Sequence, residues 1–238
     1  MLYLVATPIG NMEDITLRAL RVLKQADFIL AEDTRKTGTL LKRHGITRKL
    51  VSYHEHNEER KRPWVLEKLK EGGAIALVTS AGTPTIADPG YTLVRSCRQE
   101  NIGVGALPGP CAAVNALAMT SMPHHRFSFY GFLPKKKNQR QKILQDAADR
   151  EGASVYYESP YRLTKTLSQL AEVLPQRKIA VVREMTKKFE EVREGSAQEL
   201  KTHFTRHPPK GEIVLVVGSV QKRRALRKGG GRRQARKP

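Results

Sequence analysis

The chain has 238 residues, 39% hydrophobic and 28% charged, a balance typical of a globular protein and not of a disordered or membrane-spanning one. No apolar run approaches the ~20 residues that cross a bilayer, and the first residues lack the basic start of a signal peptide. The two cysteines have no paired spacing, which excludes a disulfide framework. We therefore expect a cytoplasmic protein without a membrane partner. Lys and Arg outnumber Asp and Glu by 43 to 23, and the net charge of +20 predicts a polyanionic partner such as RNA.

Strands and helices alternate along the first half of the chain. Short apolar runs predict strands at 2–7, 28–31, 50–53, 75–78 and 104–107. Apolar residues at helical spacing predict helices at 14–23 (capped by Asp14), 64–69, 91–100 and 111–119, and a short helix ends at 40–45. This alternation is typical of an α/β lobe with a mainly parallel sheet, which we assign to residues 1–121.

The pattern restarts after Met122-Pro123-His124-His125, which we interpret as a joint. Strands are predicted at 127–133, 154–158, 179–183, 191–194 and 213–217, with helices at 138–150 and 163–174. Because several of these strands follow one another without a helix, the second lobe, residues 122–220, is expected to contain a mixed sheet.

A basic tail follows, residues 221–238, with nine basic and no acidic side chains and three consecutive glycines. This composition predicts a flexible arm that contacts RNA or the ribosome, and a purely solubilising tail is the alternative.

Three loops at strand ends are the strongest candidates for a ligand site. The longest, residues 79–90, combines Gly, Pro and small hydroxyl residues directly after the strand at 75–78. Residues 7–11 and 107–113 form similar turns between a strand and a helix. Ligands of α/β folds bind at the carboxyl ends of strands, so we expect one pocket made largely of backbone and small side chains.

Other candidates for chemistry are weaker. His54-Glu55-His56 offers two imidazoles but no third ligand at a recognisable spacing, so no metal site is predicted. Cys111 precedes a helix but has no histidine placed to activate it, which favours a packed residue. The chain has neither a P-loop nor a dinucleotide fingerprint. A pocket with few candidate acids, bases or metal ligands suits transfer of an already activated group, because positioning of the reactants then provides most of the rate acceleration.

Eight motifs in register carry a family resemblance that spans nearly all of residues 2–218. They are 7–11 with Asp14-Ile15-Thr16, Ala31-Glu32-Asp33-Thr34-Arg35, Ala81-Gly82-Thr83-Pro84 with Asp88-Pro89-Gly90, 107–112, 130–134, Tyr157-Glu158-Ser159-Pro160 with Arg162-Leu163, 183–187, and Lys210-Gly211-Glu212. In this order the set resembles the RNA-modifying branch of the tetrapyrrole methylase family. The resemblance implies a two-lobed α/β fold and a homodimer. It also implies 2′-O-methylation of a cytidine ribose in the decoding region of small-subunit (16S) ribosomal RNA.

The resemblance further implies S-adenosylmethionine as the methyl donor, bound in the cleft between the lobes. The residues expected to contact it are Ser80, Ala81, Gly82, Thr83, Ile86, Cys111, Ala112, Tyr157, Glu158, Arg183 and Gly211. Residues expected on the substrate side are Thr7, Pro8, Gly10 and Asn11, with Glu32, Asp33 and Arg35 as candidates to hold the RNA.

Two points concern the chemistry itself. The family usually has Asp where this chain has Ser80, which removes a charge beside the cofactor. A ribose hydroxyl is a poor nucleophile, so a base or a cation should assist it, and Glu184 and Lys210 are our candidates for these roles. A structural ion pair between Arg183 and Glu184 is the alternative.

At the level of function, a small-molecule tetrapyrrole methylase and a non-catalytic ribosome-binding protein are the competing interpretations.

Overall fold

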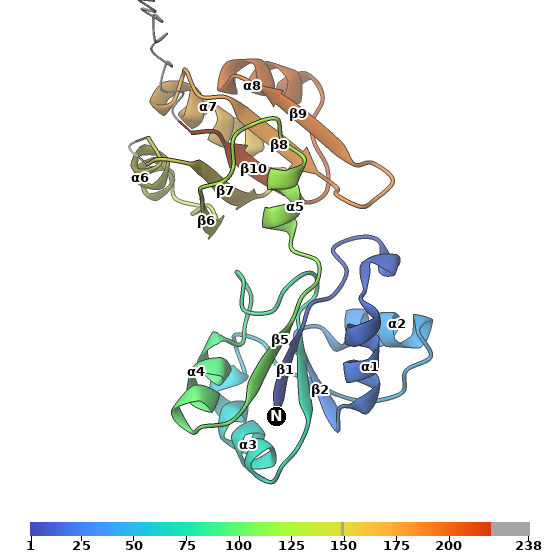
Figure 1. Ribbon diagram of the computed structural model, residues 1–238. Helices are drawn as coiled ribbons and strands as arrows, with labels where there is room; N and C mark the ends of the chain where they lie inside the picture. The colour runs from blue at the N-terminus through green and yellow to red at the C-terminus, as the bar shows by residue number, and fades with distance from the viewer. Residues whose placement is uncertain (149, 220–238) are drawn as a thin grey trace, which may run out of the picture.

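The computed structural model describes residues 1–148 and 150–219, so the predicted tail at 221–238 lies outside the described residues. Two five-stranded sheets, one from each half of the chain, lie one above the other (Figure 1). In the described ranges no helix is long and apolar enough to cross a membrane.

The first sheet, predicted to be mainly parallel, is entirely parallel. It contains β1 (Leu2–Val5), β2 (Phe28–Ala31), β3 (Lys49–Ser52), β4 (Ile75–Val78) and β5 (Val104–Leu107) in the order β3-β2-β4-β1-β5. Helices α1 (Leu17–Gln25) and α2 (Thr34–Arg43) pack on one face, and α3 (Glu58–Lys70) and α4 (Tyr91–Gln99) pack on the other. Because both faces are covered, all four residues of β2 and of β4 are buried.

The second sheet is mixed, again as predicted. Its strands are β6 (Phe127–Phe132), β7 (Ala153–Glu158), β8 (Ile179–Arg183), β9 (Glu191–Gly195) and β10 (Ile213–Val217), in the order β6-β7-β10-β8-β9. Only β6 and β7 run parallel. Helices α6 (Lys137–Asp146), α7 (Leu163–Val173) and α8 (Ala197–Arg206) cover one face, and α5 (Ala112–Ala118) packs on the other, toward the first lobe (Figure 1).

The main local differences from the prediction are the start of α3, at Glu58 instead of residue 64, the cap of α1 and the presence of helix α8. Asp14 does not cap α1: it ends a short 3₁₀ turn, η1 (Met12–Asp14), and the hydroxyl of Thr16 accepts the N–H of Ala19 instead. Helix α8 was not predicted because most of its residues are polar. A capping box formed by Ser196 and Glu199 marks its start.

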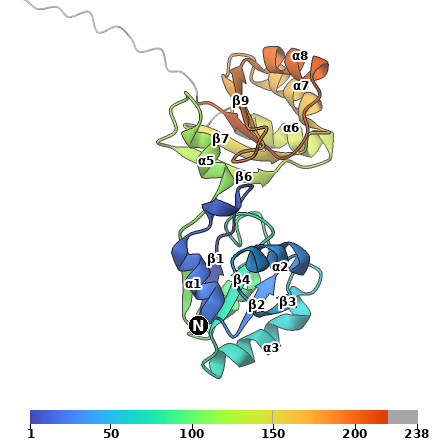
Figure 2. The ribbon, with the colours of Figure 1, turned by 90° about the vertical axis from the view of Figure 1, so that its right-hand side faces the viewer.

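The two lobes meet at the carboxyl ends of the first sheet's strands. Figure 2 shows the loop after β1, with η1, reaching from the lower lobe toward the upper one. Met122, at the predicted joint, is buried in the cluster that α5 forms with the second sheet. The exact lobe boundary near residue 122 stays a prediction.

Candidate active site between the lobes

A cavity of 480 Å³ lies where the strand-end loops of the first lobe face the second sheet. Its walls come from both halves of the chain. Of the residues expected to contact the cofactor, all but Arg183 line it: Ser80, Ala81, Gly82, Thr83, Ile86, Cys111, Ala112, Tyr157, Glu158 and Gly211. The three loops singled out in the sequence therefore line one cavity. The loops at 79–90 and 107–113 contribute several residues each, and the loop after β1 contributes Ile9.

Hydrogen bonds fix these three loops to one another. Thr7 and Gly82 exchange two backbone N–H···O=C bonds of 2.9 Å, and the Thr7 hydroxyl donates to the carbonyl of Thr79. The hydroxyl of Thr83 donates to the carbonyl of Pro110 over 3.0 Å. Gly82 has a φ of +82°, a conformation that glycine adopts without strain. Thr7, buried and outside the cavity lining, thus supports the loop that forms the wall.

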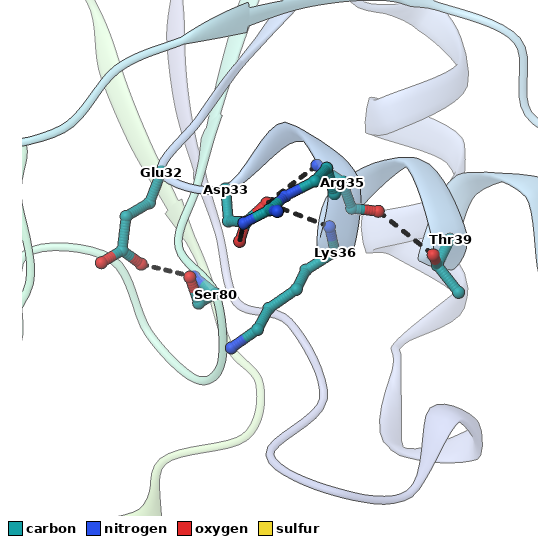
Figure 3. Close-up of polar contacts among 6 residues, drawn as sticks. All are labelled: Glu32, Asp33, Arg35, Lys36, Thr39 and Ser80. Carbon is teal, nitrogen blue, oxygen red and sulfur yellow. Dashed lines mark hydrogen bonds and ion pairs between the residues drawn. The ribbon is translucent and has the colours of Figure 1, made fainter.

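The carboxylate of Glu32 closes one side of the cavity. It follows β2 and accepts the backbone N–H of Ser80 over 2.8 Å, as Figure 3 shows. Next to it, Asp33 caps α2 by accepting the N–H groups of Arg35 and Lys36. The Arg35 side chain is 90% exposed and lies 3.3 Å from the Asp33 carboxylate, which holds the pKa of Asp33 below its ordinary value. Ser80 therefore lies directly beside a carboxylate even though its own side chain carries no charge.

A second, acidic hollow of 380 Å³ adjoins the cavity through Glu32, Ser80, Ala87 and Asp88. Burial, and secondarily the negative charge of Glu32, raise the pKa of Asp88 to about 6. Asp33, His54, Glu55 and His56 line the hollow as well. Among the described residues no cluster of His, Cys, Asp and Glu is arranged to hold a metal ion.

The second lobe supplies an aromatic wall. Tyr157 on β7 meets Phe132 on β6 edge to face at a centroid distance of 5.3 Å, and both line the cavity. Burial raises the pKa of Tyr157 to about 12, so its phenol stays protonated at neutral pH. Glu158 is fully buried: it accepts hydrogen bonds from Ser159 N–H and the Thr166 hydroxyl and pairs with Arg162 at 2.7 Å. Glu158 therefore fixes the turn that follows β7.

Glu184 lies behind the cavity wall rather than in the lining. Its carboxylate accepts the N–H of Glu212 over 3.0 Å and the ammonium of Lys187 over 2.9 Å. The Glu212 N–H, and then Lys187, lower the pKa of Glu184. Arg183 pairs with Glu191 at 2.5 Å, so Arg183 and Glu184 do not form the ion pair considered from the sequence. A carboxylate stabilised in this way is a weak base, and the catalytic assignment of Glu184 stays a prediction that its surroundings do not favour.

The loop after β1 joins the lobes. The N–H of Asn11 donates to the Thr186 hydroxyl over 2.9 Å. A methyl group added to Gly10 would lie 2.5 Å from that hydroxyl and 2.8 Å from the carbonyl of Met185, so only glycine fits there. Pro8, Gly10 and Asn11 do not line the cavity, and their substrate-binding role stays a prediction.

Lys210, the other predicted catalytic residue, lines a neighbouring groove instead of the cavity. Sequence reasoning did not single out Ile9, Asp88, Phe132 and Met185, which do line the cavity. All four fall inside motifs that carry the family resemblance, so membership of those motifs was the signal that could have identified them.

The cavity suits S-adenosylmethionine chemically. Its volume lies within the usual range for small-molecule sites. The donor combines a positively charged sulfonium, an ammonium and a carboxylate with a flat aromatic base. Carboxylates at Glu32 and Asp88 match the positive charge, and small side chains with the Tyr157–Phe132 wall match the base. Residues 80–83, 111–112 and 157 are those that would hold it.

Comparisons with known proteins agree with this geometry. The family model described as Tetrapyrrole (Corrin/Porphyrin) Methylases matches residues 1–201. Proteins named Ribosomal RNA small subunit methyltransferase I are 48% identical in Halalkalibacterium halodurans (91% of this chain, 75% of the relative) and 44% identical in Thermotoga maritima (92% and 99%).

The fold is also found among solved structures. Uroporphyrin-III C-methyl transferase from Thermus thermophilus, complexed with S-adenyl homocysteine, superimposes with a TM-score of 0.62 at 18% identity, over 91% of this chain and 96% of that one. The chain therefore belongs to the tetrapyrrole methylase family, in which it is similar to the ribosomal RNA small subunit methyltransferases I, and S-adenosylmethionine is its methyl donor.

Proposed function

We propose that the protein methylates ribosomal RNA of the small subunit, at the 2′-oxygen of a cytidine ribose in the decoding region. The observation that carries the proposal is the cavity between the lobes, built by the same loops that carry the family resemblance. The relatives at 44–48% identity are named for small-subunit ribosomal RNA, and the net charge of +20 suits a polyanionic substrate. We further propose that it acts in the cytoplasm as a homodimer, and that the basic tail assists binding to the subunit.

When bound, S-adenosylmethionine supplies a methyl group on a positively charged sulfur. The residues of this chain then have three tasks. The loops at 80–83 and 111–112 orient the donor, and the Tyr157–Phe132 wall packs against its base. Asp88 lies where the cavity opens into the acidic hollow, and its pKa of about 6 leaves it ionised yet basic near neutral pH. Asp88 is thus better placed than Glu184 to accept the proton that the ribose hydroxyl loses.

The test is transfer of labelled methyl from S-adenosylmethionine to small ribosomal subunits that lack the modification, followed by nuclease mapping. Label on a ribose 2′-oxygen of a cytidine supports the proposal. Transfer to a tetrapyrrole but not to subunits would identify a small-molecule methylase. Binding to subunits with neither transfer nor cofactor binding would identify a non-catalytic ribosome-binding protein.

The Asp88→Asn variant tests the proton acceptor. It keeps the size of the side chain but removes a carboxylate from the cavity, so it should bind the cofactor more weakly and lose transfer even at saturating cofactor.

A further inference from the structure

A second groove, of 610 Å³, opens beside the cofactor cavity on the second lobe. It lies between the turn after β7 and the segment that joins α8 to β10. Phe204, only 2% exposed, forms part of its lining, together with Pro160, Pro208 and Pro209. No acidic side chain lines this groove. Its lining therefore combines aromatic and proline side chains with one lysine and carries no negative charge.

Two side chains in this groove have neither a ring partner nor an ion-pair partner among the described residues. Tyr161 is 91% exposed, the largest exposure of any large hydrophobic side chain in the described ranges, and its ring makes no contact with another ring there. Lys210 forms no ion pair with any residue of 1–148 or 150–219, whereas Lys187 pairs with the carboxylates of Glu184 and Glu212. An unpaired aromatic ring beside an unpaired ammonium is the combination that binds single-stranded nucleic acid.

The groove adjoins the cofactor cavity, because Pro160 and Gly211 line both. On its other side the cavity opens into the hollow lined by Glu32, Asp33, Glu55 and Asp88. That hollow repels phosphates, so a polyanionic strand that reaches the cavity has its favourable path along the Tyr161 side.

We propose that this groove binds a nucleotide next to the one that is methylated. Its unstacked base lies on the ring of Tyr161, and a phosphate of the same strand contacts the ammonium of Lys210. The inference rests on the proposed RNA substrate and adds the position of the strand on the protein. It gives Lys210 a role in binding, in place of the catalytic role predicted from sequence.

The experiment measures RNA affinity of the full, cofactor-free chain. The probe is a fluorescently labelled single-stranded oligocytidylate of about ten nucleotides, within the usual site size of such proteins. Tyr161→Ala should weaken binding about 5- to 150-fold, the range expected for loss of one base–aromatic stack. Tyr161→Phe should bind like the wild type. Tyr91→Ala, at a 66% exposed tyrosine on α4, is the matched control and should leave affinity unchanged.

Salt dependence tests the phosphate contact. Lys210→Gln should lower the slope of log affinity against log salt by about 0.7, the value for one contact to a single strand. Lys24→Gln on α1 is its control, expected to leave the slope unchanged. Binding of S-adenosylmethionine by each variant reports that the fold is intact.

Three results would overturn the inference. Equal RNA affinities of wild type and Tyr161→Ala, with methyl transfer to subunits intact, would show that the groove does not bind RNA and would not affect the proposed function. A change of sedimentation in Tyr161→Ala without a change in RNA affinity would make the groove a protein contact. A wild-type chain that neither binds RNA nor methylates subunits would remove the proposed function and the groove together.

Discussion

Replacement of Glu184 by alanine separates a structural role from a catalytic one. The carboxylate accepts the N–H of Glu212 and pairs with Lys187, and it is 18% exposed. A hydrogen bond to a charged group contributes about 1.5–3 kcal/mol, and a partly exposed ion pair adds at most about 1 kcal/mol. We expect Glu184→Ala to lower the free energy of unfolding by about 2–3 kcal/mol, that is, the melting temperature by roughly 5–10 °C for a chain of this size.

The pH dependence of this loss follows from the pKa. Since the folded-state pKa of Glu184 is lowered, its contribution to stability is complete above the ordinary value of 4.5 and disappears as the pH falls through the folded-state value. The stability difference between wild type and variant should therefore shrink in acid. Thermal unfolding followed by calorimetry at pH 7 and at pH 3 measures it.

The decisive assay is single-turnover methyl transfer at saturating cofactor. Met185 and Glu212, the neighbours of this carboxylate, line the cavity, so cofactor affinity should fall while transfer at saturation persists. Glu184→Gln, which keeps an acceptor for the Glu212 N–H, should be less destabilised. A Glu184→Ala variant with an unchanged melting temperature and no transfer would refute the reasoning and restore Glu184 as the base.

Three further predictions concern the cavity. Asp88→Asn should raise the melting temperature at pH 8 but not at pH 4. Because the pKa of Asp88 is raised to about 6, its ionisation opposes folding as the pH rises, and the variant removes that cost. Calorimetry at both pH values checks this. Ser80→Asp adds a carboxylate to those of Glu32 and Asp88 and should raise the pKa of Asp88, which moves the acidic limb of the pH–rate profile to higher pH. An unmoved limb would argue against Asp88 as proton acceptor. Gly10→Ala should lower both melting temperature and cofactor affinity because its methyl group meets Thr186. Gly38→Ala is the control: its methyl group would make only an ordinary 3.7 Å contact with Leu50, so this variant should gain up to about 1 kcal/mol of stability.

Much of the fold can be predicted because the strands of the core are apolar runs with clear ends. The predicted bounds 28–31, 75–78, 104–107, 179–183 and 213–217 coincide with β2, β4, β5, β8 and β10. Helix α8 was missed although Ala197, Leu200 and Phe204 recur at helical spacing, because its remaining residues are polar.

The first-lobe part of the site was predictable for a different reason: loops at the ends of parallel strands share one edge of the sheet. The second-lobe part was not. Arg183 faces Glu191 across β8 and β9, and this partner follows from strand register, which the sequence does not display. Glu184 and Thr186 adopt positive φ values of 50° and 64°, conformations that sequence patterns assign to glycine. The turn that brings them behind the cavity therefore leaves no local signal.

The central place of β10 in the second sheet has a consequence for synthesis of the protein. The strands of the first sheet are all complete by Leu107, so that lobe has its whole sheet early in translation. The second sheet instead waits for its last strand, because β10 separates β7 from β8. A nascent chain shorter than Ile213–Val217 carries two unpaired strand edges, which are sites of aggregation. Ribosome stalling before residue 213 should thus yield a folded first lobe attached to a chaperone-dependent second one.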